Sequence, residues 1–72
     1  MAKYERIRNL REDNDMTQAE IGKRLNVSQR AYAHYESGTR EIPIDILIKI
    51  ADIFNVSIDY LVNRSDKKKE SD

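Results

Sequence analysis

The 72-residue chain has no cysteine, only two glycines and a single histidine, His34. Without cysteine there is no disulfide and no thiolate metal site. One histidine is too few for an imidazole zinc site. The chain also lacks a glycine-rich phosphate loop and a second histidine for acid–base work. We therefore expect no catalytic residue, no metal and no cofactor, and the chain is not predicted to be an enzyme.

Long apolar runs are missing as well. No stretch approaches the ~20 apolar residues that a membrane span needs, and the chain does not open with the pattern of a signal peptide. We therefore expect a cytoplasmic protein that does not bind a membrane. A reducing cytoplasm also fits the absence of cysteine.

The chain has no excess of positive charge, although such an excess is typical of nucleic-acid-binding proteins. Its 13 basic residues are balanced by 13 acidic residues, and the calculated isoelectric point is about 6.6. The distribution is less even, because residues 1–40 hold eight basic and six acidic side chains. Composition alone does not indicate a nucleic-acid partner, so the order of the residues has to decide.

Apolar residues recur at helical spacing along most of the chain, and no alternating strand pattern occurs. The spacing predicts an all-α fold in one domain over residues 1–64, followed by a polar tail, residues 65–72, that we expect to be disordered. Five helices are expected: about residues 3–14, a second after Thr17, a third after Ser28, a fourth from Ile44 to Phe54 and a short fifth after Ser57.

The second and third helices are short and are joined by a tight turn. Thr17 has Glu20 three residues later, which is the spacing of a capping box. Asn26 can adopt the left-handed conformation that a sharp turn requires, and Gly38 is suited to end the third helix. Two such helices are typical of a helix-turn-helix, whose second helix enters the major groove of DNA. We therefore interpret residues 28–37 as a recognition helix.

The third helix has an inward and an outward face when each residue is advanced by about 100°. Arginine pairs with guanine, glutamine with adenine, and a small residue such as Ala33 can contact a thymine methyl group. The outward residues could also form an ordinary solvated face, but the cap and turn before them favour DNA. The predicted base contacts are the outward residues Gln29, Arg30, Ala33 and His34.

Several motifs make the chain similar to a known family. Thr17-Gln18, Val27-Ser28, the segment 35–38 (Tyr-Glu-Ser-Gly) and the later segment 50–61 resemble, in order and spacing, the Cro/phage-repressor (XRE-like) helix-turn-helix domains. The resemblance covers about residues 5–63. It implies a compact five-helix repressor-type DNA-binding domain, with Gln29, Arg30 and His34 at the positions that meet base edges.

The resemblance also implies roles for residues outside that outward face. Gln18 corresponds to a phosphate contact, and Arg11 and Glu36 correspond to an ion pair between the first helix and the end of the third. Two departures concern packing: Gly22 stands where the family usually has alanine, and Asn26 where it usually has glycine. The implied contacts to the DNA backbone are Gln18, Ser28, Ser37, Thr39 and Arg40.

The fourth helix is apolar at eight of its eleven positions, which is more than a surface helix normally buries. One interpretation is a central core helix. The other is that some of its isoleucines form a dimer patch with the fifth helix. A homodimer would place two recognition helices about 34 Å apart, so that the operator would be an inverted repeat. The residues of this candidate patch are Ile44, Ile46, Ile53 and Val62.

The sequence therefore predicts a transcriptional regulator that binds double-stranded DNA, acts as a repressor by occupying its site, and forms a homodimer. We expect regulation through the protein's concentration or through a regulatory protein partner. The alternative is an antitoxin-like or other protein-interaction module. The polar set on the outward face of the third helix favours the DNA hypothesis, because a pure interaction module would not need it.

Overall fold

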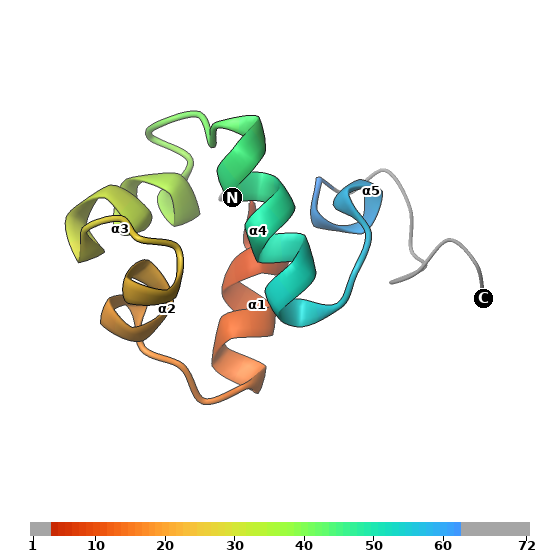
Figure 1. The fold of residues 1–72 in the computed structure, drawn as a ribbon, viewed down its shortest axis with the longest axis horizontal. Coiled ribbons are helices and arrows are strands. Elements are labelled where there is room, and N and C mark those ends of the chain that lie inside the picture. Colours follow the sequence, from red (N-terminus) through yellow and green to blue (C-terminus); the bar gives the residue numbers. More distant parts are fainter. Residues whose placement is uncertain (1–3, 63–72) are drawn as a thin grey trace.

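The computed structural model describes residues 4–62, and within that range the chain forms five helices and no strand. The predicted all-α fold is confirmed there. The predicted disordered tail, residues 65–72, lies outside the described residues. Figure 1 shows α1 and α4 at the centre of the view, α2 and α3 on one side, and α5 on the other. The helices are α1 (Glu5–Asp13), α2 (Gln18–Arg24), α3 (Gln29–Ser37), α4 (Ile44–Phe54) and α5 (Ile58–Leu61).

Hydroxyl side chains begin three of the helices, as the sequence predicts. The Thr17 hydroxyl accepts a hydrogen bond from the backbone N–H of Glu20 at 3.1 Å, and the Glu20 carboxylate accepts one from the Thr17 N–H at 2.9 Å. Ser28 and Ser57 each accept a bond from a backbone N–H three residues later, at 3.0 Å. Each cap pairs a backbone donor that the helix itself cannot satisfy.

Left-handed residues set the turns on either side of α3. Asn26 has a φ of 60°, and Gly38 has a φ of 83°, so both predicted turn residues have the expected conformation. Gly22 allows a close approach, because a Cβ atom there would lie 3.2 Å from the carbonyl oxygen of Val27. The Val27 N–H donates to the Gly22 carbonyl at 2.9 Å. The α2–α3 turn is therefore packed directly on α2.

One hydrophobic core joins the helices. Packing pairs α2 with α3, α1 with both α3 and α5, and α4 with α5. At the α1–α5 contact the guanidinium of Arg6 lies 4.3 Å from the centre of the Tyr60 ring and donates to the Tyr60 carbonyl at 3.1 Å. The largest fully buried side chains are Ile7, Ile21, Leu25, Tyr32, Ile50 and Leu61.

The structure corrects the candidate patch on α4. Ile46 is only 7% exposed and belongs to the core, while Ile53 and Val62 are half-buried against it. Ile44 and Ile48 are the large apolar side chains exposed on α4, at 64% and 45%. The predicted patch groups Ile44 with Ile46, and only the packing of α4 shows that Ile46 faces the core while Ile44 does not. None of the helices in residues 4–62 is long and apolar enough to span a membrane.

Candidate nucleic-acid interface

Helix α3 buries one face and presents the other, on the side away from the core. Tyr32, Tyr35 and Glu36 are buried, whereas Gln29 and Arg30 are exposed. The other two predicted base contacts, Ala33 and His34, are half-buried. The four outward residues therefore share one face, but only the two at the start of α3 project freely.

A buried carboxylate holds α3 in place. The Nε and Nη2 atoms of Arg11 donate to the two oxygens of Glu36 at 2.8 and 3.1 Å, which makes a bidentate ion pair. The Tyr32 hydroxyl donates to the same carboxylate at 2.6 Å, and the Gln18 amide at 3.3 Å. Arg11 also donates to the carbonyl of Met16 at 2.7 Å. One acidic side chain thus connects α3 to α1 and α2.

The pKa values of this cluster follow from its geometry. Burial alone would raise the pKa of Glu36, but the hydrogen bonds from Arg11, Tyr32 and Gln18 outweigh burial and lower it. Burial and the bond to Glu36 raise the pKa of Tyr32, so its hydroxyl remains a donor. The hydrogen bond to Glu36 also raises the pKa of Arg11. The pair is therefore charged at neutral pH.

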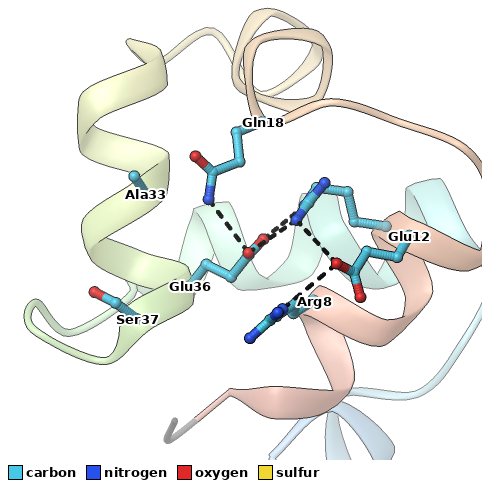
Figure 2. A pocket seen from close by; sticks show the side chains of 7 residues that line it. Arg8, Glu12, Gln18, Ala33, Glu36 and Ser37 are labelled. Atoms are coloured by element: carbon cyan, nitrogen blue, oxygen red, sulfur yellow. Dashed lines mark hydrogen bonds and ion pairs between the residues drawn. The ribbon is translucent and has the colours of Figure 1, made fainter.

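A cleft opens between α1, α2 and the outward side of α3 (Figure 2). It has a volume of about 560 Å³ and is mostly polar. Gln18 lies at the start of α2 and reaches toward Glu36. The cleft is lined by Arg8, Arg11, Glu12, Gln18, Ala33, Glu36 and Ser37.

A second, smaller hollow of about 230 Å³ lies on the other side of α3. The loop after α3 folds back there, because the Arg40 N–H donates to the His34 carbonyl at 3.2 Å. The hydroxyl of Ser37 bonds to that same carbonyl at 3.2 Å and is paired with the hydroxyl of Thr39. This fold-back gathers Ser37, Thr39 and Arg40 at the end of α3. The hollow is lined by Ser28, Arg30, Ala31, His34 and Arg40.

Sequence reasoning missed two parts of this surface. Arg8 and Glu12 line the larger cleft from α1, although neither belongs to the helix-turn-helix. Their i, i+4 spacing was a visible sign of a pair on one helix face, but nothing local indicates that this face borders α3. Tyr32 lies on the buried face of α3, and only the tertiary structure shows that its hydroxyl donates to Glu36.

The sequence was also compared with known proteins. A family model described as "Helix-turn-helix" matches residues 7–61, which is most of the chain. The chain belongs to the XRE-type helix-turn-helix family. The match begins inside α1 and runs to the end of α5, and it confirms the resemblance seen in the motifs.

Three curated relatives carry this helix-turn-helix region. The HTH-type transcriptional regulator ImmR of Bacillus subtilis is 32% identical over 74 residues, covering 100% of this chain and 58% of the relative. The uncharacterized HTH-type regulator YqaE of the same organism is 34% identical, with 90% and 56% covered. The cryptic phage CTXphi transcriptional repressor RstR of Vibrio cholerae is 37% identical, with 92% and 61% covered. The chain thus spans little more than half the length of these relatives.

Proposed function

We propose that this chain is a sequence-specific DNA-binding transcriptional regulator that represses by occupying its site. The observation that carries the proposal is the outward face of α3. Gln29 and Arg30 are exposed at the start of a helix whose inner side is anchored by the bidentate Arg11–Glu36 pair. A major groove admits a single helix, and these two side chain types read adenine and guanine edges. The names of the helix-turn-helix relatives, transcriptional regulators and a phage repressor, support the same function.

Residues around α3 divide into two kinds of proposed contact. Gln29, Arg30, Ala33 and His34 face the bases. Phosphate and sugar contacts position a protein on the duplex without reading its sequence. Those proposed contacts come from the start of α2, the cap of α3 and the loop after it: Gln18, Ser28, Ser37, Thr39 and Arg40.

We further propose a homodimer that binds an inverted repeat. A single recognition helix reads only a few base pairs, and a chain of net charge zero gains little from phosphates. The exposed Ile44 and Ile48 offer an apolar strip on α4. Lys49 lies beside this strip with Asp45 and Asp52 one turn away on either side. A second copy of the same strip, placed antiparallel, brings lysine and aspartate of opposite chains within reach.

Selection of bound sites from random duplex DNA, with affinity measured against salt, tests the proposal. An enriched inverted repeat is the expected result. A single enriched half-site would retain DNA recognition and overturn the dimer. No enrichment at low salt would overturn DNA recognition and favour the protein-interaction alternative.

Two variants then test the division of contacts. Arg30→Ala should relax the preference at one operator position by about 1–3 kcal/mol if its contact to guanine is bidentate. Gln18→Ala should weaken binding to all sites alike, because a phosphate contact carries no sequence information. A changed base preference in Gln18→Ala, or an unchanged one in Arg30→Ala, would contradict the assignment.

A further inference from the structure

The larger cleft brings an arginine of α1 next to the outward face of α3, although α1 lies outside the helix-turn-helix. Arg8 extends from α1 toward α3 in Figure 2, below the buried Glu36. The opposite wall is formed by Ala33 and Ser37, which stand one turn apart on α3. The cleft therefore opens beside the helix proposed to enter the major groove.

Within this cleft the four charged side chains are not equally available. Arg11 and Glu36 neutralise each other in a bidentate pair, with side chains only 12% and 6% exposed. Arg8 and Glu12 form a longer contact, 3.6 Å between Nε and Oε2, with side chains 57% and 51% exposed. Exposed pairs of this kind are weak. Arg8 is therefore the cation of the cleft that can exchange its partner.

We propose that this cleft seats one phosphate of the DNA backbone at the edge of the major groove, and that Arg8 is its ligand. The inference rests on the proposed DNA-binding function and adds a contact from α1 to it. A guanidinium binds a phosphate in a bidentate manner, which is stronger than an exposed contact to a carboxylate at 3.6 Å. On binding, Arg8 exchanges Glu12 for the phosphate.

Glu12 then limits affinity. Its carboxylate lines the same cleft and lies 3.6 Å from the Arg8 guanidinium and 3.9 Å from that of Arg11. A phosphate entering the cleft meets this negative charge. Removing the charge while keeping the side chain's size, as in Glu12→Gln, should therefore tighten binding to every DNA sequence.

The test uses the full chain and a duplex carrying its selected site. Arg8→Ala should weaken binding roughly tenfold on all sequences alike and reduce the slope of log affinity against log salt by about one unit. Arg8→Lys should restore most of the slope, since it restores the charge. Lys23→Ala removes the same charge from an exposed position in the last turn of α2 that lines neither hollow and should leave affinity and slope unchanged.

Neutral methylphosphonate linkages placed one at a time along the site locate the contact. The wild type should lose affinity when any of several linkages is made neutral. The affinity of Arg8→Ala should no longer change at one of these linkages, which should lie next to the base pairs that Ala33 contacts. Circular dichroism verifies that each variant is folded.

The outcomes separate this inference from the function on which it rests. Arg8→Ala could leave the DNA affinity, its salt dependence and the pattern of sensitive linkages unchanged, while Arg30→Ala still alters base preference. In that case DNA recognition stands and the proposed phosphate site is wrong. Tighter DNA binding by the Glu12→Gln variant supports the proposed phosphate site, and weaker binding contradicts it. If the wild type binds no DNA, both the proposed function and the proposed phosphate site are wrong.

Discussion

Helices α3 and α4 each bury one face, but different chemistry lies beneath them. On the buried face of α3, the carboxylate of Glu36 accepts hydrogen bonds from Arg11, Tyr32 and Gln18. The buried face of α4 is hydrocarbon, with Ile50 fully buried and Leu47 nearly so. Charge-assisted hydrogen bonds constrain direction as well as distance, whereas apolar burial is non-directional. A helix that has to meet base edges at fixed positions gains from the first kind of support, and a core helix needs only the second.

Removing Arg11 should produce the largest loss of stability. Arg11→Ala leaves Glu36 buried with a charge that no cation balances, which costs about 3–5 kcal/mol. Denaturant unfolding at neutral pH measures the change. The double variant Arg11→Met with Glu36→Gln leaves no charge in the site and should be more stable than Arg11→Ala. If the double variant is no better, the charge is not the source of the loss, and the contrast between α3 and α4 weakens.

Truncating the core of α4 should cost somewhat less. Ile50→Ala removes a fully buried side chain and should destabilise the protein by about 2–5 kcal/mol. In protein too dilute to dimerise, Ile48→Ala removes the same atoms from a side chain that is 45% exposed and should stay within about 0.5 kcal/mol of the wild type. Equal losses in the two variants would show that the exposed strip is covered in solution. Unfolding at several protein concentrations separates that case from an error in the fold.

Low pH should reduce the contribution of the Glu36 contacts on α3 to the free energy of unfolding, and should leave the contribution of the apolar face of α4 unchanged. The pKa of Glu36 is lowered in the folded protein, so its contribution to stability is complete above its unfolded value, about 4.3. That contribution is lost as the pH falls through the lowered pKa. Subtracting the pH–stability curve of Glu36→Gln from that of the wild type isolates this carboxylate. The difference should shrink below about pH 4, and a flat difference would contradict the assignment. The Ile50→Ala penalty should not change over that range.

Removing a helix cap should give the smallest loss of stability. Comparing two caps shows whether DNA binding depends on which helix is affected. Ser28→Ala and Ser57→Ala each remove one hydroxyl acceptor at 3.0 Å and should each cost about 1 kcal/mol of unfolding free energy. Ser28 begins the proposed recognition helix, so its variant should also weaken DNA binding. Ser57 begins α5, and its variant should leave DNA affinity unchanged once both proteins are folded. Equal affinity losses would contradict a special role for the start of α3.

Local sequence was sufficient for the helices and their ends. The hydroxyl caps, Asn26 and Gly38 act within a few residues of the chain, so their roles follow from hydrogen-bonding geometry and allowed backbone angles. The inward and outward faces of α3 were also predictable, because an amphipathic helix encodes them in its own period. The family resemblance added the Arg11–Glu36 pair, which spacing alone does not predict.

The arrangement of distant residues was decided only by the tertiary structure. Whether Ile46 or Ile44 of α4 faces the core depends on how α4 is rotated against the other helices, and the two side chains are identical. The cleft that brings Arg8 of α1 beside Ala33 of α3 joins residues 25 positions apart in the chain. Periodicity reports only which residues share a face of one helix. Which faces meet is determined by how all the helices together fill one core, and that is a property of the whole fold.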